Sequence, residues 1–225
     1  MNVCRRLFTG VGLMFLLTAV GSPILFADIV DGNFEAGWPG YLSGDFASGY
    51  TPVTPGGGDH SLYPEGAFTV TTDPHLVHNL WSSFGDHTTG TGQMMIVNGD
   101  TQNGVVVWAG HNSAPLAPGE YTFSAWVASL YPTNPANLTF SVDDLRLGNF
   151  TASATPGLWQ QFSQTFTITS ANPTFGIVNL NTQANGNDFA IDDIHLEQVP
   201  EAGFYSALAL NLGGLLLFVR RRRKA

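Results

Sequence analysis

The sequence predicts an all-β protein, built as an antiparallel β-sandwich or jelly roll, on three observations. Short runs alternate apolar and polar residues, which is the period of a strand with one buried face. These runs are rich in β-branched and aromatic residues, which fit a pleated, half-buried surface. Clusters of Gly, Pro, Asn and Asp separate the runs, for example at residues 98–100, 117–119 and 185–188, and such clusters favour turns.

We expect strands, in chain order, at residues 67–72, 93–97, 104–109, 121–127, 138–142, 159–168, 174–180 and 188–196. Short strands at this spacing are typical of a sandwich or jelly roll. Trp126 and Trp159 stand within two of these strands, so we expect both rings in the core. Residues 28–198 suffice for one domain with a sizeable core.

The N-terminal segment predicts export. Arg5 and Arg6 precede an apolar run at residues 7–20, and a short region ending in Ala27 follows. This is the order of a secretory signal peptide, which we assign to residues 1–27 with cleavage after Ala27. An uncleaved N-terminal anchor is the alternative. The only cysteine, Cys4, lies in this leader, so the mature domain has no disulfide.

The C-terminal segment predicts a membrane helix. Residues 203–219 carry no charge, and as a helix they would be about 25 Å long, near the lower limit for crossing a bilayer core. A basic cluster follows, made of Arg220, Arg221, Arg222, Arg223 and Lys224. Such a cluster strongly prefers the cytoplasmic side, so the C-terminus is expected inside. A buried terminal helix of a soluble domain is the alternative.

A short motif precedes this apolar stretch: Val199, Pro200, Glu201 and Ala202. Together, residues 199–225 resemble the PEP-CTERM sorting signal of exported proteins from Gram-negative bacteria that make extracellular polysaccharide. The usual motif is Pro-Glu-Pro, and here Ala202 replaces the second proline. The resemblance implies processing by exosortase, export through the inner membrane, transient anchoring there, and a final place at the cell surface or in the extracellular matrix.

The charge of the predicted domain restricts its partners. Residues 28–200 contain sixteen acidic residues and one basic residue, Arg146, for a formal net charge of −15 with neutral histidines. Nucleic acids and anionic polymers need cations for attraction, so neither is expected to bind directly. A lyase acting on uronic acids is disfavoured for the same reason. The acidity suits divalent cations, or serves solubility alone.

Four segments, taken in order, resemble a galactose-binding-like jelly roll of the carbohydrate-binding-module 4/9 kind: residues 31–35, 116–126, 159–166 and 187–196. The resemblance implies that the first and last strands lie together around a structural calcium ion, with Glu35, Asp192 and Asp193 as ligands. Asp192 and Asp193 are neighbours in a strand and point to opposite sides, so only one is expected to face the ion. Carboxylates at a sheet edge without metal are the alternative.

Aromatic side chains in or near loops are the candidate sugar contacts, since flat rings suit the apolar face of a sugar: Trp38, Tyr41, Trp81 and Trp108. Packing in the core or among loops is the alternative for each of them. The histidines match no tight metal-ligand spacing, and we interpret them as solvated.

The sequence contains no Gly-x-Ser-x-Gly elbow, no His-Glu-x-x-His and no phosphate-binding glycine loop. We therefore expect a non-catalytic surface or matrix protein that binds carbohydrate or another surface component. Two alternatives stay open. One is a jelly-roll glycosidase that uses two of the many carboxylates. The other is a structural matrix protein without a specific ligand.

Overall fold

The computed structural model describes residues 26–27, 29, 32–37, 46–143 and 145–200. Residues 24–199 form one compact unit. Most of the predicted signal peptide and all of the predicted C-terminal membrane helix and basic cluster lie outside the described residues. Within the part that is described, no helix is long and apolar enough to span a membrane.

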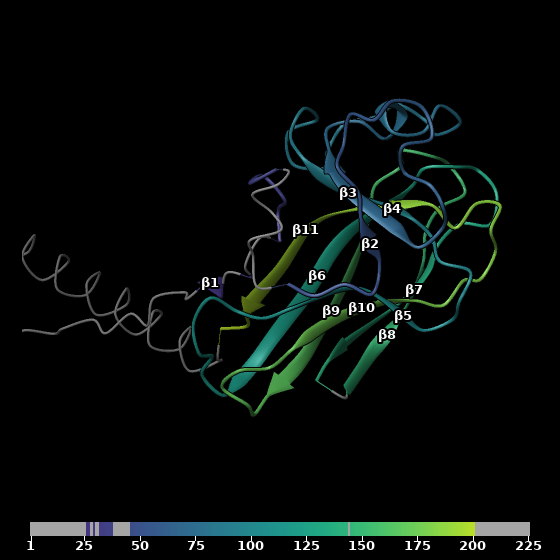
Figure 1. The fold of residues 1–225 in the computed structure, drawn as a ribbon. Coiled ribbons are helices and arrows are strands. Elements are labelled where there is room, and N and C mark those ends of the chain that lie inside the picture. Colours follow the sequence, from purple (N-terminus) through teal and green to yellow (C-terminus); the bar gives the residue numbers. More distant parts are fainter. Residues whose placement is uncertain (1–25, 28, 30–31, 38–45, 144, 201–225) are drawn as a thin grey trace, which may run out of the picture. The chain divides into compact units, whose positions relative to one another are not determined.

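Seven strands form the larger sheet (Figure 1). They are β1 (Phe26–Ala27), β2 (Thr51–Pro52), β3 (Ala67–Thr71), β4 (Met94–Asn98), β6 (Gly119–Ser129), β9 (Gln160–Ile168) and β11 (Phe189–Gln198). The order is β2-β3-β4-β11-β6-β9, and β1 pairs with β11 beyond the end of β4. Only β2 and β3 run parallel, while the other pairs are antiparallel. The long strands β6 and β11 therefore lie side by side near the middle of the sheet.

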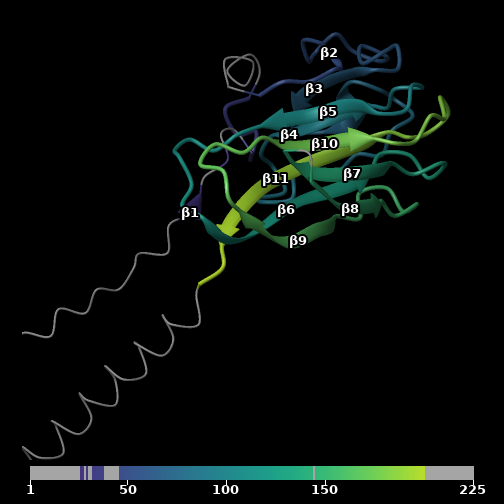
Figure 2. The same ribbon diagram turned by 90° about the horizontal axis from the view of Figure 1, so that it is seen from below.

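Four strands form the smaller sheet, in the order β5-β10-β7-β8 (Figure 2). They are β5 (Val105–Gly110), β7 (Asn137–Val142), β8 (Leu145–Thr151) and β10 (Phe175–Asn179), and all pairs are antiparallel. The prediction of an all-β protein with mainly antiparallel sheets is thus confirmed. Each predicted strand is present, and no strand end differs from its predicted position by more than two residues. The strands β1, β2 and β8 were not predicted.

The inner faces of the two sheets pack against each other through phenylalanine rings. Phe140 of β7 stacks on Phe162 of β9 with ring centroids 3.8 Å apart. Phe123 of β6 lies 5.1 Å from Phe175 of β10, also between centroids. Aromatic pairs of this kind contribute about 0.5–1.5 kcal/mol beyond the burial of their area. One continuous core therefore joins the sheets into a sandwich.

Loops cover one part of the outer side of the larger sheet. Leu62, Val77 and Trp81 pack against the outward side chains of β4 and β11, including Ile96 and Ala190. A 3₁₀ turn, η2 (Pro74–Leu76), belongs to this layer. All residues of β3 and β4 are consequently buried, whereas β6 and β9 alternate between buried and more exposed positions. The larger sheet thus has an uncovered outer face over β6, β9 and the second half of β11.

Candidate functional site

The outer face of β6, β9 and β11 follows directly from the alternation of their residues. In β6, Phe123, Ala125 and Val127 are buried in the core, so Ser124 and Trp126 point to the other side. Trp126 pairs with Gln161 of β9 and with Asp192 of β11. A half-buried tryptophan therefore lies among polar side chains on this face.

A β-bulge in β11 shapes one border of the face. The pairing with β6 shifts between Asp192 and His195, and Asp193 has a left-handed backbone with φ of 46°. The Ile194 amide donates to the carbonyl of Gly32 at 2.8 Å. A Cβ on residue 32 would lie 2.1 Å from the Ile194 carbonyl oxygen, so only glycine permits this approach. The bulge thus docks the turn at residues 32–37 beside the face.

A loop at residues 84–92 forms a second border, and the carboxylate of Asp86 holds its shape. Asp86 accepts hydrogen bonds from the amides of Thr89 at 2.8 Å and Gly92 at 2.6 Å. Burial acts to raise the pKa of Asp86, but the hydrogen bonds from Thr89 and Gly92 outweigh it and leave this pKa below its ordinary value. The loop is therefore tied around an ionised carboxylate.

His87 connects this loop to the bulge. Its amide donates to Asp192 Oδ2 at 2.9 Å, and its ring nitrogen Nδ1 lies 2.7 Å from Asp193 Oδ2. Because a carboxylate oxygen accepts, Nδ1 carries the hydrogen of this bond. The hydroxyl of Thr88 donates to the other oxygen of Asp193 at 2.7 Å. The loop and the bulge are thus joined by hydrogen bonds to two adjacent carboxylates.

Four partly exposed rings meet here, and we call them the ring cluster: Phe84, His87, Trp126 and Trp159. His87 stacks on Trp126 with centroids 3.7 Å apart and planes 16° apart. Trp159 meets both His87 and Phe84 edge to face, at 5.9 and 5.8 Å between centroids. The indole nitrogen of Trp159 donates to the carbonyl of Gly85 at 3.2 Å. The rings therefore form one connected cluster on the outer face of the larger sheet.

A groove of about 510 Å³ lies beside the ring cluster. Its described lining is mostly polar and includes Asn33, Ser124, Trp126, Gln161, Asp193 and His195. These side chains come from β6, β9, β11 and the docked turn. Hydroxyl and amide groups next to an aromatic ring can bind a ligand that has both hydroxyl groups and apolar ring faces.

Asp192 lies beneath this groove and is completely buried. Burial, together with the nearby charges of Asp193 and Asp86, raises the pKa of Asp192 to about 7, although hydrogen bonds from the His87 and Asp193 amides oppose the shift. Asp192 is thus a buried acid that does not reach the surface, whereas Asp193 does line the groove.

The predicted calcium ligands make other contacts. Glu35 Oε1 accepts from the Gln93 amide at 3.2 Å, while Asp192 and Asp193 bond to His87 and Thr88 as described above. Among the residues that the structure describes, no group of three or more His, Cys, Asp or Glu side chains is arranged to hold a metal ion. The described geometry does not gather Glu35, Asp192 and Asp193 into one ligand set.

The structure changes the assignment of the tryptophans. Trp81 is 3% exposed and donates its indole hydrogen to Asp188, and Trp108 is 0% exposed, so neither offers a ring face to a sugar. A glycine at position 110 leaves room for the Trp108 ring, which a Cβ would approach to 2.5 Å. Trp38 and Tyr41 lie outside the described residues.

The core assignment of Trp126 was wrong, since Trp126 is only partly buried and belongs to the ring cluster. Trp159 is also partly buried and belongs to the ring cluster, but it packs against the hydrophobic layer on the outer side of β4. The alternation of residues 121–127 contained the signal for Trp126, because Tyr121, Phe123, Ala125 and Val127 already fill the inner face. No sequence pattern indicated His87.

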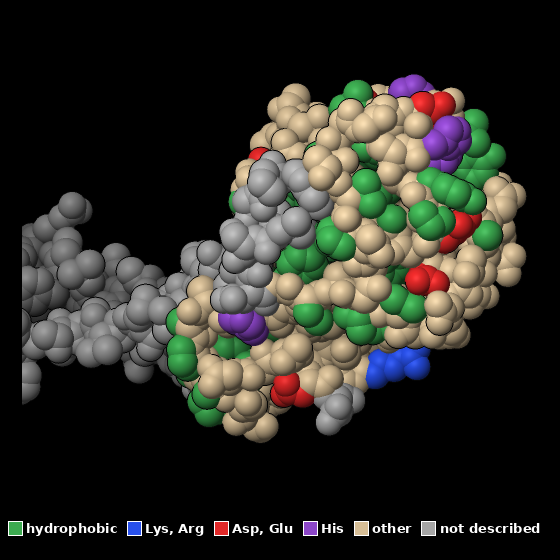
Figure 3. Space-filling model, in the orientation of Figure 1, with side chains coloured by type: hydrophobic (Ala, Val, Ile, Leu, Met, Phe, Trp, Pro, Cys, Tyr) green, Lys and Arg blue, Asp and Glu red, His purple; other side chains and the backbone are tan. Residues whose placement is uncertain are grey.

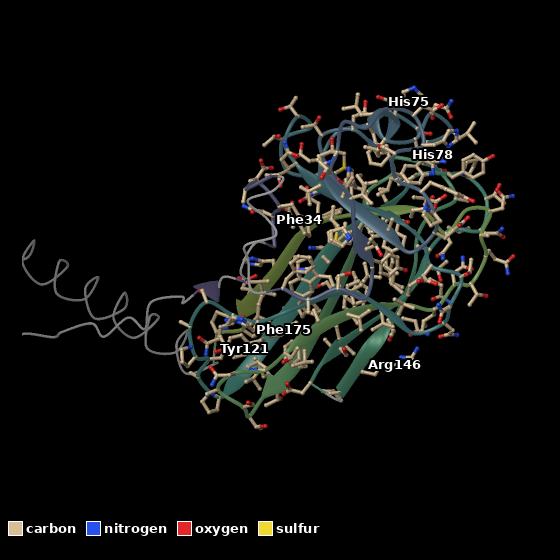
Figure 4. All side chains as sticks on the ribbon, in the orientation of Figure 1. Phe34, His75, His78, Tyr121, Arg146 and Phe175 are labelled. Atoms are coloured by element: carbon tan, nitrogen blue, oxygen red, sulfur yellow. The ribbon has the colours of Figure 1, made fainter. Side chains whose placement is uncertain are left out.

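The histidines are less scattered than the sequence indicated. The loops at residues 59–64 and 75–80 lie side by side, and His60 Nδ1 is 3.1 Å from His78 Nε2 (His78 is labelled in Figure 4). The Leu80 amide donates a hydrogen bond to His78 Nδ1 at 3.4 Å. Because Nδ1 therefore accepts, Nε2 of a neutral His78 carries the hydrogen that is shared with His60. Burial, and then the charge of His60, lowers the pKa of His78.

Two residues of the predicted sorting motif are described. Val199 donates its amide hydrogen to the carbonyl of Glu120 at 2.8 Å, directly after β11, and Pro200 follows. Glu201, Ala202 and the basic cluster lie outside the described residues. The sorting motif therefore begins where the described sandwich ends.

No protein-family model matches the sequence, and no curated protein matches it. Similar solved structures include an arabinose-bound α-L-arabinofuranosidase, MgGH51, at 8% identity and a TM-score of 0.51, over 79% of this chain. This chain spans only 27% of that enzyme. The carbohydrate-binding module TmCBM61, in complex with β-1,4-galactotriose, matches 75% of this chain and 96% of its own at 12% identity and a TM-score of 0.46. A cyclase from Fischerella sp. TAU matches 78% of this chain and 98% of its own, at 13% identity and a TM-score of 0.49. Likeness at these identities concerns the fold alone.

Proposed function

We propose that this chain is a non-catalytic carbohydrate-binding protein whose site is the groove and the ring cluster on the outer face of β6, β9 and β11. The observation that carries the proposal is a half-buried tryptophan, Trp126, that borders a polar groove of about 510 Å³. Sugars present apolar ring faces together with hydroxyl groups, and binding sites for small molecules combine aromatic surface with a few placed polar groups. Ser124 and Gln161 supply neutral partners for sugar hydroxyls.

The substitution Trp126→Ala tests this proposal. We expect affinity for a bound oligosaccharide to fall at least about tenfold, since central aromatic contacts are typical binding hot spots. The control is Tyr63→Ala, because Tyr63 is a largely exposed aromatic residue on the loops that carry His60. A glycan array selects the ligand, and calorimetry on the full chain compares the variants. Equal loss of affinity in both variants, or none in Trp126→Ala, would contradict the proposed site.

The non-catalytic part of the proposal has its own test. Asp192 has a raised pKa, as a general acid requires, but it is fully buried and cannot reach a substrate. We expect no new reducing ends when the chain is incubated with an oligosaccharide that it binds. Formation of new reducing ends by the wild-type chain, lost in the Asp193→Asn variant, would favour the glycosidase alternative. A glycan array without any bound ligand would favour the structural matrix protein.

We also propose that residues 199–225 act as a sorting signal processed by an exosortase-type enzyme, with transient anchoring in the inner membrane. The motif, the uncharged stretch and the basic cluster support this by their order. Mass spectrometry of the surface or secreted form should find a C-terminus near Pro200 to Ala202. A mature protein that retains Lys224 would contradict processing, and Ala202→Pro tests whether the variant motif limits it.

The structural calcium ion implied by the resemblance stays a prediction. The charge around Asp192 favours a cation, whereas the contacts of Glu35, Asp192 and Asp193 do not form a ligand set. A thermal melt in excess calcium and in chelator decides between them. A higher Tm in calcium that Asp193→Asn removes would support the ion, and an unchanged Tm would contradict it.

A further inference from the structure

Apart from the histidines His87 and His195, the charged side chains on the outer face of β6, β9 and β11 are all acidic. The acidic side chains are Asp193 at the bulge and two exposed glutamates, Glu120 and Glu197, which stand on the same side of their strands as Ser124 and Trp126. In the part of the chain that the structure describes, the single Lys or Arg is Arg146 (Figures 3 and 4). It lies on β8 of the smaller sheet, where it bonds to Thr139 and Asn149.

From this distribution we infer that the site prefers glycans bearing free amino groups, such as polymers of hexosamine, over neutral glycans, and rejects uronic acid and sulfated glycans. The inference rests on the proposed function, because it concerns the ligand of the same groove.

The groove itself is suited to a polar, uncharged sugar backbone. Ser124 is 7% exposed and lines the groove, and no residue in the described ranges makes a hydrogen bond to its hydroxyl. A nearly buried hydroxyl that no described residue engages can donate to or accept from a ligand hydroxyl. Gln161 lies on β9 opposite Trp126, also lines the groove and offers an amide. These groups account for binding of the sugar, independently of charge.

Asp193 adds the preference for positive charge. Its side chain is 26% exposed at the groove, and each carboxylate oxygen accepts one hydrogen bond, from His87 or Thr88. A carboxylate oxygen has two acceptor sites, so both oxygens can still accept from an ammonium group. Its ion-pair partner is His87, which carries a charge only when protonated, and the one described arginine, Arg146, bonds to Thr139 and Asn149 instead. An ammonium group on the ligand therefore gains attraction here.

The same arrangement disfavours anionic glycans. A uronate or sulfate in the groove would lie near Asp193, and none of the described residues beside it is a lysine or arginine that could neutralise it. Like charges at short distance repel, and the repulsion weakens as salt screens it. Preference for amines and rejection of acids thus have one cause, and both should fall with ionic strength.

The test compares three oligosaccharides of equal length on the full chain by calorimetry, at low and high salt: N-acetylglucosamine, glucosamine and galacturonate oligomers. An exposed ion pair contributes about 0.2–1 kcal/mol, so we expect the free amine to bind up to about fivefold tighter than its acetylated counterpart at low salt. The ratio should approach one at high salt, and the uronate should bind more weakly than the acetylated oligomer at low salt. Asp193→Asn should bring the ratio near one at low salt and keep binding of the acetylated form.

Asp59→Asn is the matched control, since Asp59 is an exposed carboxylate on the loops around His60 and should leave the ratio unchanged. Glu197→Gln is a second variant on the same face in case Asp193→Asn loses its fold, and it should lower the ratio. Equal or tighter binding of the acetylated oligomer, or a ratio that Asp193→Asn and Glu197→Gln both leave intact, overturns the inference alone. If none of the three oligomers binds and a wider glycan array shows no ligand, the proposed function is overturned as well.

Discussion

The two sheets share one core but present different outer faces. On the larger sheet, the outward residues of β6 and β9 include Trp126 and Gln161, and a bulge and a loop border them. On the smaller sheet, the outward residues of β7 and β10 include no aromatic ring and no carboxylate, and Arg146 of β8 bonds to Thr139 of β7. Equal burial on the inner side therefore does not make the faces equivalent. What differs is the irregular backbone beside the larger sheet, which gathers rings and carboxylates at one place.

The largest effect should come from the core that both faces share. Phe140→Ala removes a fully buried ring that stacks on Phe162 across the two sheets. We expect the free energy of unfolding to fall by about 3–5 kcal/mol, measured by urea denaturation. Because one core supports both faces, a single cooperative transition should remain. Two separate transitions would indicate that the sheets are independent units.

The next largest effect on stability should come from two buried carboxylates, Asp192 beneath the groove and Asp188 beneath the covering loops. Burial is the main cause that raises both pKa values from 3.8 to about 7. A raised pKa in the folded state means that stability is fully present below pH 3.8 and is lost as the pH rises through about 7. We expect unfolding free energy to drop by on the order of a few kcal/mol over this window.

Asp188→Asn should remove its share of that loss, because an amide still accepts from Trp81 but does not ionise. Asp192→Asn should likewise remove the contribution of Asp192 to the loss of stability. Urea midpoints across the pH window measure both. The lowered pKa of Asp86 acts in the opposite direction, and its contribution is lost only as the pH falls below 3.8. A stability that rises with pH through neutrality would contradict the burial of the two carboxylates.

The bulge offers a smaller and more local change. In Gly32→Ala, the new Cβ would lie 2.1 Å from the Ile194 carbonyl oxygen, so the turn at residues 32–37 must move away from β11. Overpacking of this kind costs about 1–3 kcal/mol. Thermal denaturation measures this cost, and glycan affinity should fall with it since Asn33 lines the groove. Gly104→Ala is the spatial control, because a Cβ at this position would have no atom within 4 Å, although its φ of +87° adds backbone strain.

The smallest effect is expected on the smaller sheet. Arg146→Gln removes the single Lys or Arg side chain among the described residues. The contacts of Arg146 to Thr139 and Asn149 are exposed. Stability should change by no more than about 0.5 kcal/mol, and glycan affinity should not change. Calorimetry with the ligand of the wild-type chain checks this. A clear loss of affinity would move the site to the other sheet.

Alternation in the sequence predicted the strands because each has one face in a common core. It missed β8, where Leu147 and Phe150 both pack against the core although they are three residues apart. The pairing of β7 with β8 shifts between Phe140 and Ser141, and this irregularity breaks the period of two. A regular strand with one buried face shows an alternating apolar and polar sequence, whereas a strand with a bulge does not.

The candidate site was harder to predict for the same reason. Trp126 could have been placed on the outer face by alternation, but its contact with His87 depends on a loop that no local pattern connects to β6. The family resemblance singled out Asp192 and Asp193. The bulge in β11 separates their side chains, so that Asp192 is buried and Asp193 lines the groove. Contacts between segments far apart in the chain are set by tertiary packing, which the sequence pattern alone does not contain.

Hydrogen exchange of the full chain, with and without its bound oligosaccharide, measures whether glycan binds to the outer face of β6, β9 and β11. We predict added protection in β6, β9, the second half of β11 and the loop at residues 84–92, with none in β7, β8 and β10. Protection confined to the strands of the smaller sheet would contradict glycan binding at this face.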